Sequence, residues 1–296
     1  MPMPADFLAV DWGSTRVRAE LWREGVCQGR REGQGGVLAS RPSDFEAGLA
    51  ELCGDWIDAH PDLPVVLSGM VGAREGWLEL PHLPVPAGLD ELAAALAELP
   101  STRWPGRILG VPGLRQVAPV DLMRGEEVQV LGALEGPQAC FCLPGTHSKW
   151  VRVEGGRITD FRTFLTGELY QALLGLGSYR SFGPEAGGDG PAFEAGLAAS
   201  AKGLGLLNDL FGARVTALHG LRGAELGSYL SGLLVGHELR SALTWAAAGE
   251  ILLVGAEALC QPYESGLAAL GRPSRRVPEG SHARGIRRLL AGEGWS

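Results

Sequence analysis

The sequence predicts an α/β protein built from two modest domains. Apolar strands alternate with amphipathic helices along most of the chain. At 296 residues, the chain is longer than one domain of common size. A pattern of apolar strand, glycine turn and alternating strand occurs near the N-terminus and again in the second half. These three observations together predict two similar α/β halves.

The first half reads as strands separated by two helices. Residues 7–10 form a continuous apolar run, typical of a central strand. Ser43 and Glu46 form a capping-box pattern that opens a helix over 43–59. The other expected elements are strands at 17–21, 64–69 and 107–111 and a helix at 88–99.

The second half starts near residue 121, and a helix is predicted over 126–134. Later strands are expected at 139–143, 149–153, 157–161 and 251–255, and helices at 166–176, 191–202, 223–243, 262–270 and 282–291. The predicted domains are therefore 1–120 and 121–296. Whether the last helix packs back on the first domain is left open.

Composition excludes several classes of partner. The net charge of −8 and the pI near 5.3 argue against nucleic-acid binding, and six C-terminal arginines are expected on a solvated tail and helix face (Arg272, Arg275, Arg276, Arg284, Arg287 and Arg288). No leader pattern is visible, and Glu250 and Glu257 interrupt the most apolar window. Five scattered cysteines fit a reducing compartment. We expect a cytoplasmic protein with no membrane partner, and a homodimer stays open.

Two short turns carry the most informative residues. The sequence DWGST (11–15) follows the first strand, and PGTHS (144–148) follows the strand at 139–143. In each turn a glycine is followed directly by a hydroxyl residue, so backbone N–H groups and hydroxyls can converge on an anion without a lysine. Two such turns facing each other would hold a polyphosphate. Asp11 is placed to hold Mg²⁺ through water.

Other nucleotide-binding signatures are absent. The chain has two lysines, Lys149 and Lys202, and neither lies in a G-x-x-x-x-G-K-[ST] pattern. No G-x-G-x-x-G follows the first strand. Neither a P-loop enzyme nor a Rossmann dehydrogenase fits.

A carboxylate near residue 126 is the candidate for a catalytic base. Glu126 and Glu127 open a predicted helix just before the second turn, and Asp121 is a rival. Such a base mainly orients a hydroxyl nucleophile in phosphoryl transfer. Acidic residues also favour helix N-termini for structural reasons, the interpretation we prefer for Glu127.

Several residues beside these turns are candidates for substrate binding. Arginine grips carboxylates and phosphates through paired N–H groups. The candidates are Arg16, Met70, Arg74, Arg124, His147 and Lys149.

Five segments together resemble the 2-dehydro-3-deoxygalactonokinase family: FLAVDWGSTRVRAELW, GMVGAREGW, MRGEEVQVLGAL, LPGTHSKWV and DFRTFLTGEL. They stand in the order of that family, and the similarity covers nearly the whole chain. The resemblance implies two RNase H-like lobes of the actin-like ATPase superfamily, with mixed sheets flanked by helices and the active site in the cleft between the lobes. It implies transfer of the γ-phosphate of ATP to the 6-hydroxyl of 2-dehydro-3-deoxy-D-galactonate.

The resemblance also implies roles for single residues. Asp11, Gly13, Ser14 and Thr15 match the first phosphate loop, Gly145 and Thr146 the second, and Gly255 and Ala256 the adenosine loop. Arg18 stands where related sugar kinases have a basic residue, which makes it a further catalytic candidate. Glu126 stands where larger carbohydrate kinases carry an aspartate, which makes it the first choice for the base.

Two alternative functions stay open. The first is a kinase of the same fold that acts on another sugar or sugar acid, such as 2-dehydro-3-deoxygluconate. The second is a non-catalytic, nucleotide-dependent interaction module.

Overall fold

The computed structural model describes residues 6–34, 36–37 and 44–292. The chain forms two compact units: the first comprises residues 1–138, 153–160 and 278–296, and the second comprises 139–152 and 161–277. Residues 121–138 and 278–296 thus group with the N-terminal part, whereas the sequence suggested a single boundary near 120. Within the described residues, no helix is both long and apolar enough to cross a membrane.

A six-stranded mixed sheet is the centre of the first unit, in the order β3-β2-β1-β4-β7-β6. Strand β1 pairs antiparallel with β2 and parallel with β4, which is parallel to β7. The strands are β1 (Phe7–Trp12), β2 (Arg16–Arg23), β3 (Val26–Gln34), β4 (Val65–Gly69), β6 (Ala97–Glu98) and β7 (Ile108–Gly110). The apolar run at 7–10 is indeed buried in the middle of this sheet.

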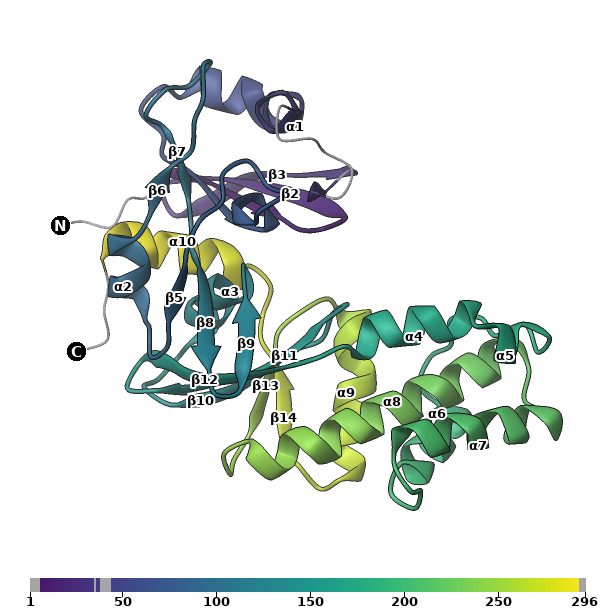
Figure 1. Ribbon diagram of the computed structural model, residues 1–296. Helices are drawn as coiled ribbons and strands as arrows, with labels where there is room; N and C mark the ends of the chain where they lie inside the picture. The colour runs from purple at the N-terminus through teal and green to yellow at the C-terminus, as the bar shows by residue number, and fades with distance from the viewer. Residues whose placement is uncertain (1–5, 35, 38–43, 293–296) are drawn as a thin grey trace. The chain divides into compact units, whose positions relative to one another are not determined.

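Helices cover both faces of this sheet (Figure 1). Leu8, Val10 and Trp12 of β1 share a buried core with Phe45 and Leu49 of α1 (Phe45–Ala59). Helix α10 (Ser281–Ala291) lies on the other face and contacts β1, α2 (Leu89–Ala94) and α3 (Glu126–Ala133). The C-terminal helix therefore belongs to the unit that contains the first strand.

Helices α3 and α10 touch backbone to backbone. A Cβ atom on Gly132 would overlap the Ser281 carbonyl, and a Cβ on Gly285 would overlap the Val128 carbonyl. Two arginines of α10 also satisfy carbonyls near the end of α3: Arg284 Nε donates to Gly132 (3.1 Å) and Arg288 Nη1 to Leu131 (2.6 Å).

The predicted solvated arginine face is thus wrong for Arg284 and Arg288. Both side chains are half-buried, and both donate to carbonyls that would otherwise have no partner at the end of a helix.

One local expectation in the first unit is wrong, and the capping box predicted from Ser43 and Glu46 stays a prediction. The helix predicted over 88–99 ends at Ala94, because residues 97–98 pair with β7 as an edge strand. Ser43 lies outside the described residues. The Glu46 carboxylate accepts hydrogen bonds from the backbone N–H of Arg103 (2.9 Å) and the hydroxyl of Ser101 (2.5 Å), which lower its pKa to about 2.

A three-stranded sheet completes the first unit and was not predicted. Its order is β5-β8-β9, with β5 (His82–Pro84), β8 (Gly113–Val117) and β9 (Val120–Met123). It leads directly into α3. A short 3₁₀ helix, η3 (Met70–Gly72), follows β4.

A five-stranded sheet, whose strands belong to the second unit except for residues 153–160, has the strand order β12-β11-β10-β13-β14. Its strands are β10 (Ala139–Leu143), β11 (Ser148–Glu154), β12 (Arg157–Phe164), β13 (Ile251–Leu253) and β14 (Ser274–Arg276). Counted along the chain, this is the arrangement 3-2-1-4-5, and β3-β2-β1-β4-β7 repeats it. The recurring turn is therefore one part of a duplicated topology.

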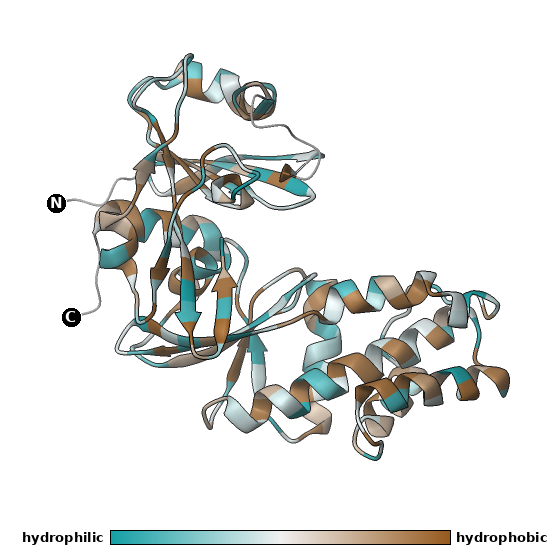
Figure 2. Ribbon diagram, viewed as in Figure 1, coloured by the Kyte–Doolittle hydropathy of each residue, from teal (hydrophilic) through white to brown (hydrophobic). Residues whose placement is uncertain are grey.

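Helices make up the rest of the second unit: α4 (Thr166–Gly175), α5 (Gly177–Arg180), α6 (Pro191–Ala199), α7 (Leu206–Leu218), α8 (Gly223–Trp245) and α9 (Glu257–Ala269). Helix α9 starts five residues before the prediction and contains Pro262. Helix α7 was not predicted. Figure 2 shows that much of this helix is apolar. Ala213 and Ala217 are buried, whereas Leu207 and Phe211 are exposed. Such a distribution gives no clear helical period.

Substitution Gly285→Ala tests the contact between α3 and α10. The added methyl group would push two backbones apart, so we expect a loss of about 1–3 kcal/mol in the free energy of unfolding, measured by denaturant titration. Gly212→Ala is the matched control, because Gly212 lies in α7 with open space around it. There alanine should be neutral or stabilising. Equal effects of both substitutions would contradict the proposed tight contact.

Candidate functional site

The first predicted phosphate turn closes the hairpin between β1 and β2. The Gly13 N–H donates to the Arg16 carbonyl (2.9 Å), and Ser14 and Thr15 are exposed at the tip. Trp12 is buried and packs edge-on against Phe45, with 5.2 Å between the ring centroids. The tryptophan therefore anchors the turn in the core and leaves the hydroxyls outside.

Asp11 lies beside a different turn, the glycine turn at the end of β4. The two strands are parallel, and Asp11 is in register with Ser68. Gly69 follows with φ +87°, and a Cβ there would be 2.8 Å from the Trp12 carbonyl oxygen and 3.4 Å from Asp11 Oδ1. Only glycine suits this backbone, so the chain turns directly against the carboxylate.

The loop before α3 packs on the same turn. Gly125 has φ +104°, and a Cβ there would be 3.0 Å from the Cα of Gly69. The first residue of α3 is Glu126, whose carboxylate accepts from the Arg124 N–H (3.0 Å) and is partly exposed. The first-choice base thus begins a helix next to the turn that borders Asp11.

The neighbouring carboxylates have different surroundings. Glu127 is completely buried and accepts from the Gly125 N–H at 2.8 Å. Burial, followed by the charge of Glu126, raises the pKa of Glu127 to about 8. Asp121 lies on β9, where its carboxylate accepts from the Leu122 N–H (2.7 Å). Of the two carboxylates next to Gly125, Glu126 is the one that is partly exposed.

The candidate substrate residues of the first unit, together with the catalytic candidate Arg18, lie in three kinds of place. The Arg124 guanidinium is half-buried and donates to the Leu80 carbonyl (2.8 Å), with His82 Nε2 at 3.1 Å. Met70 packs against the core. Arg74 is exposed just after η3, and Arg16 and Arg18 are exposed near Glu32, at 3.4 and 3.7 Å.

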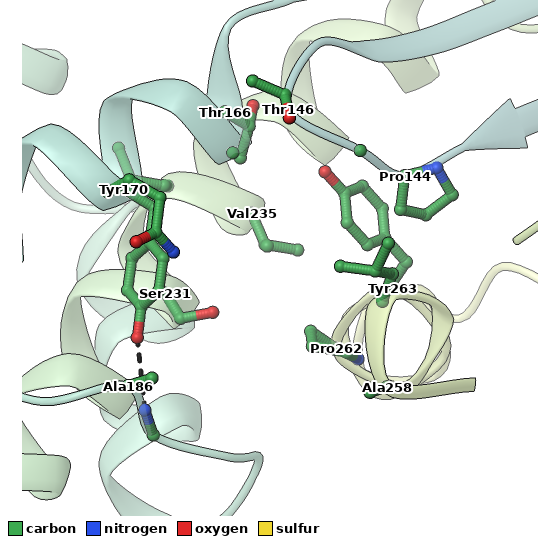
Figure 3. A pocket seen from close by; sticks show the side chains of 16 residues that line it. Pro144, Thr146, Thr166, Tyr170, Ala186, Ser231, Val235, Ala258, Pro262 and Tyr263 are labelled. Carbon is green, nitrogen blue, oxygen red and sulfur yellow. Dashed lines mark hydrogen bonds between the residues drawn. The ribbon is translucent and has the colours of Figure 1, made fainter. Parts of the chain in front are cut away.

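A cavity of about 340 Å³ lies in the second unit, beside the second predicted phosphate turn. Its walls come from that turn, from α4, α8 and α9, and from residues 186–187. Figure 3 shows Thr146 and Thr166 together at one end, and Tyr170 and Tyr263 on opposite sides. The Tyr170 hydroxyl accepts from the Gly187 N–H (3.2 Å). The lining is mostly apolar, with a few hydroxyl groups, as is typical of small-molecule pockets.

Helix α4 starts directly against the second turn. A Cβ on Gly167 would overlap the Gly145 carbonyl, so this glycine is required for the close approach. The Glu168 N–H donates to the Thr146 carbonyl (2.9 Å), and the Glu168 carboxylate is 2.6 Å from His147 Nε2. The segment DFRTFLTGEL was informative for the family, but Thr166, Gly167 and Tyr170 received no role from the sequence.

The adenosine-loop prediction falls on the same side of this unit. A Cβ on Gly255 would be 3.7 Å from the Pro144 carbonyl oxygen, and Ala258, three residues on, lines the cavity. Gly255 and Ala256 themselves are exposed beside it. Lys149, in contrast, is buried on β11, where its Nζ donates to the Thr163 hydroxyl (2.8 Å).

One buried carboxylate ties the second turn to the cavity wall. Glu238 of α8 accepts hydrogen bonds from Ser148 Oγ (2.6 Å), Trp150 Nε1 (2.8 Å) and Tyr263 Oη (2.6 Å). Burial raises the pKa of Glu238. Its partners lie 88 and 90 residues before it and 25 after it. No local motif could therefore have predicted this cluster.

Comparison with known proteins identifies the family. The family model described as 2-keto-3-deoxy-galactonokinase matches residues 11–289. The chain belongs to this family. An Escherichia coli K12 relative named 2-dehydro-3-deoxygalactonokinase is 35% identical over 274 residues, 91% of each chain. These matches confirm the resemblance seen in the sequence.

Solved structures agree with the family assignment and with the fold. A Sinorhizobium meliloti crystal structure named for the same kinase has a TM-score of 0.82 and 30% identity, over 96% of this chain and 97% of that one. The Clostridium difficile activator of 2-hydroxyisocaproyl-CoA dehydratase has a TM-score of 0.52 and 11% identity, over 97% and 94%. At that identity the likeness shows the fold alone. The predicted α/β fold of the actin-like ATPases, with its two RNase H-like halves, is confirmed.

The buried Glu127 gives this kinase-family chain a pH-dependent stability. Its folded pKa near 8 lies above the ordinary 4.5, so the folded state keeps a proton that the unfolded state releases. Stability is therefore lost as the pH rises from about 5 to 8. Glu127→Gln replaces the titrating carboxyl group with an amide that does not titrate. The melting temperature of this variant, relative to that of the wild type, should therefore rise between pH 5 and pH 8. Glu75→Gln, at an exposed carboxylate, is the control. A constant difference between Glu127→Gln and wild type would contradict the assignment.

Proposed function

We propose that this chain is an ATP- and Mg²⁺-dependent kinase that phosphorylates the 6-hydroxyl of 2-dehydro-3-deoxy-D-galactonate. The observation that carries the proposal is the family match over residues 11–289. The geometry of the two units supports it, because each predicted phosphate turn lies beside residues suited to its part of the reaction.

We assign the cavity of the second unit to the nucleoside of ATP. Its volume of about 340 Å³ and its apolar walls suit a flat heterocycle and a sugar. The first N–H groups of a helix have no partner within the helix and attract phosphate. Helix α4 presents these groups next to Gly145 and Thr146, so the phosphate groups of bound ATP would lie on that side, just outside the cavity.

Asp11 fits a role in holding Mg²⁺. The ion takes six oxygen ligands and usually keeps several waters. Among the described residues, no group of three or more His, Cys, Asp or Glu side chains is arranged to hold a metal. Water and phosphate oxygens would thus supply most ligands, and Asp11 would orient them. When bound, the ion supplies neutralisation of charge on the transferring phosphate.

Glu126 is the proposed base. It is the first residue of α3, and its carboxylate is partly exposed. The carboxylate would accept a hydrogen bond from the 6-hydroxyl, orient it for attack and then take its proton.

We assign recognition of the acceptor's carboxylate to Arg74. Its guanidinium is exposed on the turn after η3. In the described parts of the chain, Arg124, His147 and Lys149 already interact with protein groups. A paired N–H contact to a carboxylate would favour sugar acids over neutral sugars.

The acceptor is tested by measuring ADP release with a panel of compounds. We expect turnover with 2-dehydro-3-deoxy-D-galactonate to exceed that with 2-dehydro-3-deoxygluconate and with neutral hexoses. Turnover with a neutral sugar alone would contradict the proposed acceptor but would still support a kinase activity. ATP binding without turnover on any acceptor would favour the non-catalytic module.

Glu126→Gln tests the base. The amide keeps the shape but cannot take a proton, so we expect kcat to fall by about 100-fold or more, with ATP affinity unchanged by calorimetry. Asp121→Asn is the matched variant and should stay near wild type. The opposite result would make Asp121 the base.

A further inference from the structure

We propose that His282, on the first turn of α10, is a positioning residue for Asp11. No role for this histidine follows from the sequence analysis above. The proposal rests on the kinase function proposed above and adds a residue to it.

The contact that carries the proposal is a hydrogen bond between His282 and Ser68. The distance from His282 Nε2 to Ser68 Oγ is 2.7 Å, and Ser68 is fully buried. Ser68 is the parallel-strand neighbour of Asp11 and the residue just before Gly69. The bond therefore fixes the end of β4 at the point where it borders the Asp11 carboxylate.

The side chains around His282 belong to the same end of the sheet. Arg18 and Ser68 flank Asp11 in register on either side, and side chains directly opposite one another point to the same face. Burial lowers the pKa of His282, and the charged groups that also act on its ring are Asp11, Glu20 and Arg18. His282 is therefore enclosed beside the charged residues that surround the predicted metal-binding carboxylate.

Helix α10 links this end of the sheet to the proposed base. Three residues after His282, Gly285 contacts the backbone of α3, and Arg284 binds the Gly132 carbonyl. Helix α3 carries Glu126 at its start. One helix thus holds the strand beside Asp11 through His282 and the helix of the base through Gly285. Loss of the histidine contact would free the Asp11 side of this arrangement while the α3 side stays fixed.

The test compares His282→Leu, which removes the hydrogen bond, with His282→Asn, which can still form one. Residues that orient metal-binding side chains typically contribute 10–100-fold. We expect His282→Leu to lower kcat by about 10-fold or more and to raise the Mg²⁺ concentration needed for half-maximal rate, with partial recovery in His282→Asn. The increase in melting temperature caused by Mg²⁺ and ADP should also shrink, a readout independent of turnover.

Two further variants separate positioning from folding. Ser68→Ala should reproduce the His282→Leu effect, and the double variant should be no worse than either single one, because both remove the same bond. His60→Asn is the matched control. His60 precedes β4, at the end of the strand opposite to Ser68, and its Nδ1 is 2.8 Å from Arg23 Nη1. This substitution should lower the melting temperature and leave kcat and the Mg²⁺ dependence unchanged.

The outcomes distinguish the two proposals. If His282→Leu and Ser68→Ala change only the melting temperature, the positioning role is wrong and the kinase function stands. If the wild type phosphorylates no acceptor, the proposed function fails. The increase in melting temperature caused by Mg²⁺ and ADP then still tests the role of His282. If this increase is the same in the variants as in the wild type, the positioning role is wrong.

Discussion

The close contact of α3 with α10 is the constraint on which the first unit depends. Gly132 and Gly285 allow two backbones to meet where any side chain would separate them. Because the helices cannot slide apart, Glu126 at the start of one and His282 at the start of the other keep a fixed relation. The geometry proposed for phosphoryl transfer thus relies on two residues that have no side chain.

A duplicated topology explains why two similar turns exist. Five strands of each main sheet follow the order 3-2-1-4-5, and in each sheet the first hairpin contains a glycine followed by a hydroxyl. The surroundings then differ. In the first unit the turn lies beside a carboxylate and a positive-φ glycine. In the second, a helix N-terminus and a largely apolar cavity adjoin it. One arrangement suits a metal and an acceptor, and the other suits a nucleotide.

Local patterns predicted most elements but failed where tertiary pairing competed. The segment 139–143 is continuous and apolar, and it forms β10 at those bounds. Residues 97–98 follow a helical pattern, yet they form an edge strand because they pair with the edge of β7. Helix α7 carries apolar side chains on buried and exposed faces alike, which removes the period that reveals a helix.

The sequence by itself determined the family, the fold class and the two glycine–hydroxyl turns, because these depend on residues close together in the chain. Only the tertiary structure decided which distant groups meet. It joined Ser68 to His282 across 214 positions, and Ser148 and Tyr263 to Glu238. Such contacts depend on how helices cross a sheet, and a side chain carries no local sign of a partner that packing supplies.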